Sequence, residues 1–316
     1  MQQLQDNAPV LLVAFNRPQK LRNLILSLQG DKPKIVILAI DGPRRNNPED
    51  KVLVAECRSM AGLITWDCQI QELFQVSNIG LEKSVTYAVS WAVNKHGKVI
   101  VIEDDVEVGP DFITYMNQKL VQFSEVKAVM HISGYNVVPF DKISQKQNRS
   151  YRTSNYPESF AWATWADRWL SYDADLVWGQ ACTLRELRSI TGSTLGAMKW
   201  KLNFRDAASL RIDTWAYRWL ASIWSSKGVV ISPNHNLVTY NGFDEGTHTR
   251  SKAPWTEIAV TKPEGFEDEP IQLLNLDLAA EKWLAKNVFG ENLIGVFKGI
   301  AKSVALQYLT RHRRKG

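Results

Sequence analysis

Short apolar runs alternate with segments of helical periodicity in the N-terminal part of the chain. Each run is rich in aliphatic and β-branched residues and closes on turn-forming residues, which is typical of a buried strand. The segments between the runs carry apolar residues at steps of three and four, which is typical of a helix with one buried face. The predicted strands are Pro9–Phe15, Ile35–Ile40, Cys68–Gln75 and Val99–Ile102, and helices are predicted from Pro18 onward, over Val52–Ala61 and over Leu81–Val93. This alternation predicts a doubly wound α/β sheet.

The pattern becomes less regular after Phe112. The sequence predicts a helix over 113–123, a strand over 128–133, an irregular aromatic stretch over 151–169, a basic helical segment over 182–211 and a strand over 229–233. Another helix is predicted to open at Trp215, with Asp213 as a candidate N-cap. A polar, Gly-rich loop over 241–248 is of the kind that often closes over a ligand.

Three acids, Glu103, Asp104 and Asp105, directly follow the strand predicted at Val99–Ile102. Open parallel sheets bind their ligands at the carboxyl ends of the strands, so these carboxylates are candidates for a ligand site. Because adjacent acids repel one another, we expect a hard divalent cation, Mn²⁺ or Mg²⁺, carrying an anionic substrate such as a nucleotide diphosphate. The alternative that the tripeptide alone allows is an acidic turn exposed to water.

Polar side chains also stand at the ends of the first two predicted strands. Arg17 suits a diphosphate, because a guanidinium donates two parallel charge-assisted bonds, and Asp41 suits a ribose hydroxyl or a base N–H. Each has a structural alternative, a surface cation for Arg17 and a helix N-cap for Asp41. No G-x-G-x-x-G fingerprint follows the first strand, which disfavours a dinucleotide-binding fold, and the chain has no Walker sequence.

Composition adds two points to this picture. The chain has 316 residues, 45% of them hydrophobic, which suffices for one large domain or two smaller ones. Of its 12 tryptophans most lie between Trp162 and Trp255, where they serve either as core or as platforms for sugar rings. The odd count of 3 cysteines argues against a disulfide framework and favours a reducing compartment. We expect no signal peptide at the N-terminus and no membrane span.

An ordered set of short motifs carries a resemblance to a known family. The motifs are Ala14-Phe15-Asn16-Arg17, Ile40-Asp41-Gly42, Asn78-Ile79-Gly80-Leu81, the acidic stretch from Val101 to Phe112, Phe160-Ala161-Trp162-Ala163-Thr164-Trp165, Trp215-Ala216-x-Arg218-Trp219 and Gly242-Phe243-Asp244-x-Gly246-Thr247-His248. With them the chain resembles the GT-A-fold, nucleotide-sugar-dependent glycosyltransferases of the bacterial family-2 type, and is similar in layout to N-acetylglucosaminyltransferase I. The resemblance covers the chain from Pro9 to Thr249 and implies an α/β fold of the GT-A, Rossmann-like kind, with a mixed sheet flanked by helices.

The resemblance implies a role for each residue on the donor side. The Glu103-Asp104-Asp105 stretch matches the family's DxD-type motif, in which Asp105 would bind Mn²⁺ or Mg²⁺ and Asp104 would face the ribose or the donor sugar. His248, at the end of the Gly-rich loop, would complete the metal shell. The other residues expected to bind the nucleotide-sugar, a UDP-sugar by preference, are Phe15, Arg17, Asp41, Arg44, Asn78, Gly80, Lys83 and Glu103. For Lys83 the alternative is the solvated face of a helix.

The resemblance also implies an inverting reaction, in which a carboxylate takes the proton of an acceptor hydroxyl. Some relatives have Asp directly after the tryptophan that matches Trp215, where this chain has Ala216. That departure leaves Asp213 as the expected base, or else as a helix cap only, with Asp244 and Glu158 as the alternatives. The candidate platforms for the acceptor sugar, at least one of which we expect in the core, are Trp162, Trp165 and Trp215.

Together these residues predict an inverting, metal-dependent glycosyltransferase that moves a sugar to a glycan or lipid-linked acceptor in bacterial cell-surface polysaccharide or glycolipid assembly. We expect a donor half over 1–112, an acceptor half over 113–260 and a C-terminal helical extension over 261–316. One alternative is a catalytically silent sugar-binding module, which Ala216 favours. Another is a nucleotidyltransferase, although its Gly-rich loop and lysine are missing after the first strand. Nucleic-acid binding is not expected, because the basic residues are not interleaved with aromatic ones.

The C-terminal extension is predicted to form an amphipathic helix. Its apolar positions recur at steps of three and four and are Leu293, Phe297, Ile300, Val304 and Tyr308. After Glu291 the chain has no acid but carries the cations Lys298, Lys302, Arg311, Arg313, Arg314 and Lys315. Such a helix fits an anionic membrane surface, which predicts a cytoplasmic protein peripheral to the inner face of the plasma membrane. The alternative is a helix packed on the main domain with a basic end.

Overall fold

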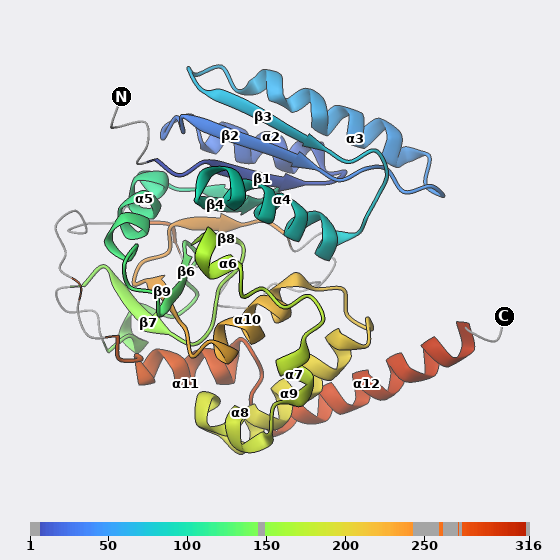
Figure 1. The fold of residues 1–316 in the computed structure, drawn as a ribbon, viewed down its shortest axis with the longest axis vertical. Coiled ribbons are helices and arrows are strands. Elements are labelled where there is room, and N and C mark those ends of the chain that lie inside the picture. The colour runs from blue at the N-terminus through green and yellow to red at the C-terminus, as the bar shows by residue number, and fades with distance from the viewer. Residues whose placement is uncertain (1–6, 145–148, 243–258, 262–270, 272–273, 314–316) are drawn as a thin grey trace.

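The computed structural model describes residues 7–144, 149–242, 259–261, 271 and 274–313, with side chains in the last helix described as far as Ala305. A mixed eight-stranded sheet is flanked by helices, and a further layer of helices lies beside its second half (Figure 1). The strand order is β3-β2-β1-β4-β8-β6-β9-β7. The predicted fold class, a Rossmann-like mixed α/β sheet flanked by helices, is confirmed.

Four parallel strands form the first half of the sheet. They are β1 (Val10–Ala14), β2 (Ile35–Ile40), β3 (Gln69–Phe74) and β4 (Lys98–Glu103). β1 lies between β2 and β4, with Leu12 opposite Leu38 and Ile102. The aliphatic side chains of these three strands are buried because helices cover both faces of the sheet. The parallel order brings the carboxyl ends of β1, β2 and β4 to one edge, as the sequence predicts.

Helices α2 (Pro18–Ser27) and α3 (Glu49–Ser59) lie on one face of these strands, and α4 (Leu81–His96) lies on the other (Figure 1). A short 3₁₀ turn, Met60–Leu63, follows α3. Pro18 occupies the first turn of α2. A backbone N–H at this position would have no acceptor within the helix, so its absence in proline costs no helical hydrogen bond. Leu21, Leu24 and Ile25 are the buried face of α2, at the spacing that predicted the helix.

The second half of the sheet combines both strand directions. Its strands are β6 (Val129–Ser133), β7 (Tyr151–Ser154), β8 (Ala161–Trp165) and β9 (Val229–Pro233). β8 runs antiparallel to β4 and β6, β9 runs parallel to β6, and β7 runs antiparallel to β9. A separate pair joins β5 (Val106–Val108) to β10 (Val238–Tyr240). The predicted irregular stretch over 151–169 is therefore wrong, since it holds two strands and the helical turn that follows them.

The remaining helices surround this second half. They are α5 (Phe112–Gln122), the 3₁₀ turn Phe140–Lys142, α6 (Ala166–Trp169), α7 (Val177–Ala181), α8 (Leu184–Thr191), α9 (Thr194–Ala208), α10 (Trp215–Ser225), α11 (Leu278–Asn287) and α12 (Leu293–Arg313). The helical segment predicted over 182–211 is interrupted at Gly192, whose positive φ of 71° ends α8. The N-cap residue of α10 is Thr214, so Asp213 does not have the capping position.

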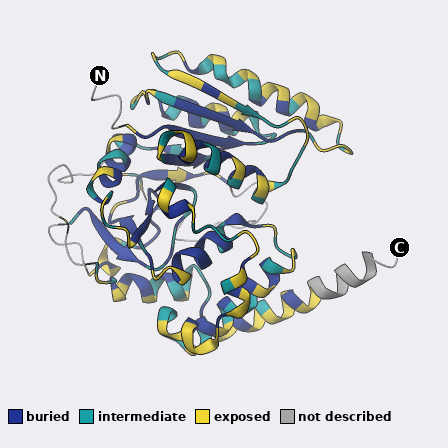
Figure 2. Ribbon diagram, in the orientation of Figure 1, coloured by how far each residue is buried: buried dark blue, intermediate teal, exposed yellow. Residues whose placement is uncertain are grey.

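An aromatic cluster fills the core between β8 and α10, where Figure 2 shows both elements buried. Trp162 stacks between His131 and Trp215, with ring centroids 5.1 Å from each. The indole of Trp219 donates to Nδ1 of His131 at 3.2 Å. Burial lowers the pKa of His131 to about 3, so this imidazole stays neutral and serves packing.

The C-terminal helices α11 and α12 are attached to the rest of the fold by buried carboxylates. Glu281 of α11 accepts hydrogen bonds from Ser154 Oγ at 2.6 Å and from the Asn155 N–H at 3.1 Å. Glu291, between the two helices, accepts from the Tyr156 hydroxyl at 2.6 Å and from the Trp200 indole at 2.7 Å. The extension therefore packs on β7 and α9 through defined polar contacts.

Candidate active site

A cavity of about 560 Å³ lies where β1, β2 and β4 end. Its lining consists of Val13, Ala14, Phe15, Asn16, Arg17, Asp41, Arg44, Leu53, Asn78, Gly80, Leu81, Ser84, Glu103, Asp104 and Asp213. Every residue expected to bind a nucleotide-sugar, except Lys83, is part of this lining. The expected base Asp213 lines it too, so the fold brings candidate donor and catalytic residues to one cavity.

Arg17 forms an ion pair with the acidic cluster at the end of β4. Its Nε donates to Asp104 Oδ2 at 3.2 Å, its Nη2 donates to Asp104 Oδ1, and its Nη1 donates to Asp105 Oδ2 at 3.0 Å. Burial lowers the pKa of Arg17, but the two carboxylates raise that pKa by more, so the guanidinium stays charged. This fork geometry is the one by which arginine recognises oxyanions.

The acids outnumber the positive charge beside them. Burial, together with the charges of Asp105 and Asp104, raises the pKa of Glu103 to about 8. Burial also raises the pKa of Asp104 to about 6, although Arg17 acts in the opposite direction. One guanidinium cannot compensate three ionised carboxylates in a buried site, and the raised pKa values of Glu103 and Asp104 reflect this. An added cation would stabilise the ionised forms.

Asp105 is the carboxylate best suited to a metal ion. Its Oδ1 is buried and has no hydrogen-bond partner within the described part of the chain. A buried oxygen without a partner costs about 1–3 kcal/mol, which coordination to a cation would remove. Oxygen donors of this kind fit Mg²⁺ or Mn²⁺, which take one or two carboxylates together with substrate phosphates. Among the described residues no three His, Cys, Asp or Glu side chains group as a complete metal site.

Asp41 fixes the loop at the start of α4. Its carboxylate accepts from the backbone N–H groups of Gly42 at 2.7 Å, Ile79 at 3.0 Å and Gly80 at 3.3 Å, and from Asn78 Nδ2 at 2.8 Å. Gly80 has a φ of 88°, which favours glycine, and it directly precedes the first turn of α4. The first N–H groups of a helix have no helical acceptor and attract anions, so this loop presents α4 to a phosphate.

Arg44 is held by a residue that the sequence did not single out. The buried carboxylate of Asp50, in the first turn of α3, accepts from Arg44 Nε at 2.6 Å and Nη2 at 2.9 Å, and from Asn16 Nδ2 at 2.9 Å. The bonds from Arg44 lower the pKa of Asp50 to about 2. The Arg44 guanidinium lies over the ring of Phe15, 5.3 Å from its centroid. The one sequence signal for Asp50 is that it is an acid in the first turn of a helix. Acids are also common at this position on exposed helices, so the signal is weak.

The Asp213 carboxylate is exposed and lies beside the start of α4, since a Cβ on Gly80 would lie 3.6 Å from Asp213 Oδ2. Two residues further along, the buried indole of Trp215 is a hydrogen-bond partner of Glu103. The start of α10 therefore contacts the acidic cluster through Trp215 and the cavity through Asp213.

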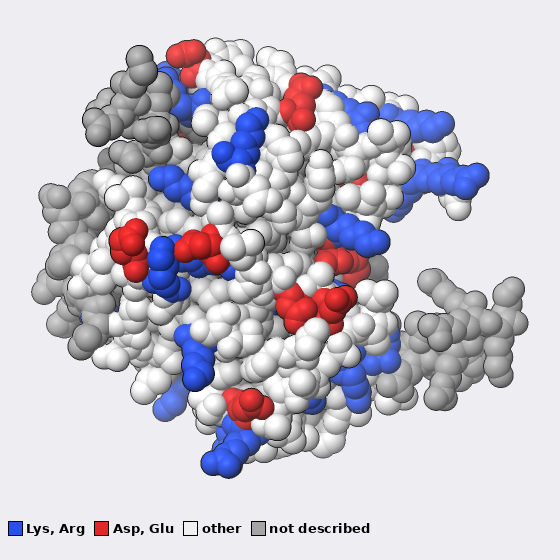
Figure 3. All heavy atoms as spheres, viewed as in Figure 1, with Lys and Arg blue, Asp and Glu red and all other residues white. Residues whose placement is uncertain are grey.

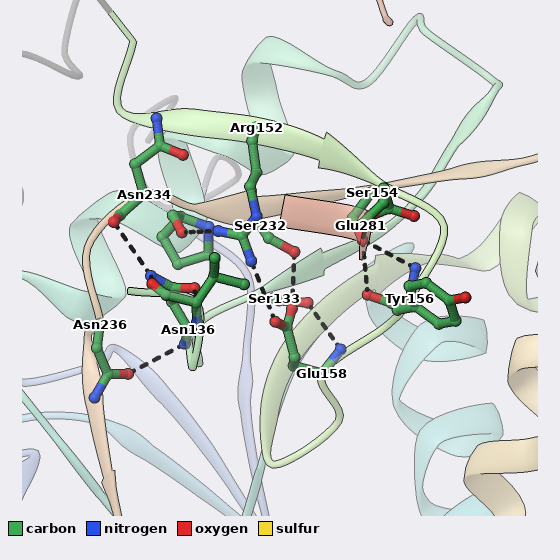
Figure 4. A network of polar contacts seen from close by, with 12 residues as sticks. Ser133, Asn136, Arg152, Ser154, Tyr156, Glu158, Ser232, Asn234, Asn236 and Glu281 are labelled. Carbon is green, nitrogen blue, oxygen red and sulfur yellow. Dashed lines mark hydrogen bonds and ion pairs between the residues drawn. The ribbon is translucent and has the colours of Figure 1, made fainter. Parts of the chain in front are cut away.

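Glu158 lies in a buried polar network between β6, β7 and β9 and is not part of the cavity lining (Figure 4). Its carboxylate accepts from Arg152 Nη2 at 3.3 Å and from Ser232 Oγ at 2.8 Å, and its N–H donates to Ser133 Oγ at 3.2 Å. Burial raises the pKa of Glu158. Through these contacts Glu158 is part of the buried core of the second half of the sheet.

The candidate acceptor tryptophans are buried. Trp162 has no exposed surface, and Trp165 and Trp215 are 5% and 3% exposed. Lys83 is exposed on α4 and is not part of the lining. The two candidates on the Gly-rich loop, Asp244 and His248, lie outside the described residues.

No protein-family model matches the chain. Among solved structures, the chain is similar to the mannosyltransferase PcManGT from Pyrobaculum calidifontis in complex with GDP-Man and Mn²⁺, with 10% identity over 69% of this chain and 74% of that one and a TM-score of 0.35. It is also similar to mouse xyloside xylosyltransferase 1 in the apo form, with 9% identity over 70% of this chain and 82% of that one and a TM-score of 0.33. At these TM-scores neither likeness bears on activity, which is inferred below from this chain's own residues.

Proposed function

We propose that this protein is a nucleotide-sugar-dependent glycosyltransferase that binds its donor in the cavity at the ends of β1, β2 and β4. The observation that carries the proposal is the convergence of Arg17, Glu103, Asp104 and the start of α4 on one cavity of about 560 Å³. That volume lies in the usual range for small-molecule sites. Asp105 is not part of the lining and lies beside it, where its Oδ2 accepts from Arg17 Nη1 at 3.0 Å. A cation-binding acidic edge next to an anion-binding helix start suits a diphosphate that carries a metal ion.

Asp105 would hold Mn²⁺ or Mg²⁺, with His248 as a further candidate ligand, and Asp104 would face the ribose or the donor sugar. When bound, the ion would neutralise charge on the departing nucleoside diphosphate. Arg17 would bind the phosphates with the guanidinium that contacts Asp104 and Asp105 in this structure. The N–H groups at the start of α4 offer a second contact to the same phosphates.

The nucleoside would occupy the part of the cavity lined by Phe15, Asp41, Arg44 and Asn78. The hydrogen bonds that Asp41 and Asp50 accept hold these groups before any ligand binds. We propose a UDP-sugar as the donor, following the resemblance in the sequence. Preorganised polar groups of this kind fix the orientation of a ligand in a pocket.

Asp213 is the proposed base of an inverting transfer. Its exposed carboxylate can take a proton from the attacking hydroxyl of a glycan or lipid-linked acceptor while the bond from the anomeric carbon to the diphosphate breaks. The setting we propose is cytoplasmic, bacterial cell-surface polysaccharide or glycolipid assembly. A silent sugar-binding module would bind the same donor without hydrolysing it, and a nucleotidyltransferase would release pyrophosphate.

The release of nucleoside diphosphate from a panel of UDP-sugars with Mn²⁺ tests this proposal. We expect slow donor hydrolysis by the wild-type protein, a loss of more than about 100-fold in Asp105→Asn, and donor binding without hydrolysis or transfer in Asp213→Asn. Asp67→Asn, an exposed acid far from the cavity lining, is the matched control and should behave like the wild type. Undiminished hydrolysis by Asp105→Asn would contradict the metal assignment.

A further inference from the structure

Helix α12 presents a stripe of large apolar side chains to solvent. Leu293, Ile294, Phe297 and Val304 are 60–68% exposed, and Ile300 is 40% exposed. Leu293, Phe297, Ile300 and Val304 lie at steps of three and four, so they share one face of the helix. Figure 2 shows that much of the described part of α12 is exposed along its length.

This stripe is not the face by which α12 packs. The packing face holds Val296 and Ser303, which are 5% and 1% exposed. Ser303 Oγ donates to Asp206 Oδ1 at 2.8 Å and accepts from Arg205 Nη2 at 2.8 Å, both on α9. The helix is therefore held on the main body by one face, and its apolar stripe is left on another.

The apolar surface continues beside α12. Ile300 also lines a groove of about 530 Å³ between α7, α8, α9 and α12, together with Leu184, Met198 and Leu202. Leu184 and Met198 are themselves 49% and 38% exposed. A continuous apolar area of this kind on a protein surface marks an interaction site.

The charge around the stripe identifies the kind of partner. Lys298 and Lys302 are exposed on α12, and no acid follows Glu291 in the sequence. The sequence adds Arg311, Arg313, Arg314 and Lys315 after the stripe. Figure 3 shows lysine and arginine side chains on the surface next to the C-terminal helix. Apolar side chains bordered by cations on one helix are complementary to an interface of acyl chains and anionic headgroups.

We propose that α12 docks the protein on an anionic lipid surface, with Leu293, Phe297 and Val304 among the acyl chains and Lys298 and Lys302 at the headgroups. No helix in the described part of the chain is long and apolar enough to cross a membrane, so the contact is an interfacial one.

Vesicle flotation of the full chain at low salt tests this inference. Vesicles of phosphatidylcholine mixed with anionic phosphatidylglycerol are compared with vesicles of pure phosphatidylcholine. We expect the wild type to float with the anionic vesicles only. Leu293→Ser/Phe297→Ser/Val304→Ser should lower the bound fraction by about tenfold or more, and Lys298→Glu/Lys302→Glu by at least about fivefold per lysine.

The matched control is Val52→Ser/Val76→Ser/Leu170→Ser, which removes three even more exposed apolar side chains elsewhere and should float like the wild type. Circular dichroism checks that all variants are folded. Equal flotation of the stripe variant and the wild type would overturn the proposal, as would no binding of the wild type to anionic vesicles. A dimer that the stripe variant converts to a monomer in light scattering would instead assign the stripe to a second copy. The assay contains no donor, so its result is independent of the proposed reaction.

Discussion

Arg17 is positioned as an internal counter-ion of the acidic cluster. It contacts Asp105, the carboxylate proposed to hold a metal ion, and its neighbour Asp104. A guanidinium and a divalent cation cannot both be close to the same oxygens without repulsion. We therefore expect that Arg17 breaks its contact with at least one of these two carboxylates when a metal ion binds. Its guanidinium is then available to donate to the phosphates.

We predict that Arg17→Gln binds Mn²⁺ more tightly in the absence of nucleotide, by about tenfold, because a competing cation has been removed. The same variant should bind a nucleoside diphosphate more weakly. Titration calorimetry with Mn²⁺ alone, and then with UDP, measures both effects. Arg22→Gln, which removes an exposed arginine of α2, serves as control. Unchanged or weaker Mn²⁺ binding by Arg17→Gln would show that Arg17 does not compete with the ion.

Asp50 is a structural anchor of the cavity wall. Asp50→Ala should lower the free energy of unfolding by about 2–4 kcal/mol, because Arg44 and Asn16 lose a buried charged acceptor. Urea denaturation measures this change. Glu49→Ala removes a neighbouring exposed acid from the same helical turn and should cost less than about 1 kcal/mol. Equal effects of the two substitutions would refute the anchoring role.

The residues of the site differ in how far their positions could be predicted from the sequence. Arg17, Asp41 and Asp104 could be placed at one edge because each follows a parallel strand, and the order of the strands brings their ends together. Asp50 could not be found, since its burial depends on how α3 packs beside the end of β1 rather than on its own helix. Asp41 lies where the sequence placed it, yet its oxygens are occupied by backbone N–H groups of a loop that no local pattern predicts.

Among the elements, β7 shows why the second half was harder to predict. Arg152, Thr153 and Ser154 are polar although they are fully buried, so no apolar run in the sequence predicts this strand. Some of its polar groups bond to distant residues, for example Arg152 Nη1 to the Pro233 carbonyl at 2.6 Å and Ser154 Oγ to Glu281 at 2.6 Å. Arg152 Nε and Thr153 Oγ1 have no partner among the described residues. A pattern of hydrophobic positions cannot indicate such a strand, because tertiary contacts replace water as the polar partner.

Docking of α11 through Glu281 should make the stability of the protein depend on pH. Burial raises the pKa of Glu281 from 4.5 to about 7 in the folded protein. Because the pKa of Glu281 is higher in the folded than in the unfolded protein, its protonation stabilises the fold. This contribution to the free energy of unfolding is complete below pH 4.5 and is lost as the pH rises through about 7. Glu281→Gln keeps the hydrogen-bonding shape without the charge, so it should be more stable than the wild type at pH 8, by about 1–3 kcal/mol.

Urea unfolding of wild type and Glu281→Gln between about pH 5 and pH 8 measures this difference, which should shrink toward the acidic end. Glu56→Gln, an exposed carboxylate on α3, is the control and should follow the wild type throughout. A difference between wild type and Glu281→Gln that does not change with pH would mean that the Glu281 carboxyl does not titrate in this range.

In the whole molecule, the cavity joins the two halves of the chain. Arg17, Asn78 and Glu103 come from the parallel half, and Asp213 comes from the start of α10 beyond four further strands. The parallel half of the sheet could be predicted from its apolar periodicity. The position of Asp213 could not, because it depends on the packing of α10 against α4 rather than on any one segment of the sequence. Donor-side residues could therefore be predicted as a group, and the approach of Asp213 to Gly80 is a result of the complete fold.

The binding of UDP in the presence and absence of Mn²⁺, measured by titration calorimetry on the wild type and Asp105→Asn, tests the proposed donor site most directly. We predict that Mn²⁺ tightens UDP binding to the wild type by at least about tenfold, because an ion held by Asp105 would attract the negative charge of the diphosphate. Asp105→Asn should lose this dependence on Mn²⁺ and still bind UDP weakly through Arg17 and the start of α4. UDP binding that is absent, or equally tightened by Mn²⁺ in both proteins, would contradict a metal-assisted donor site at the end of β4.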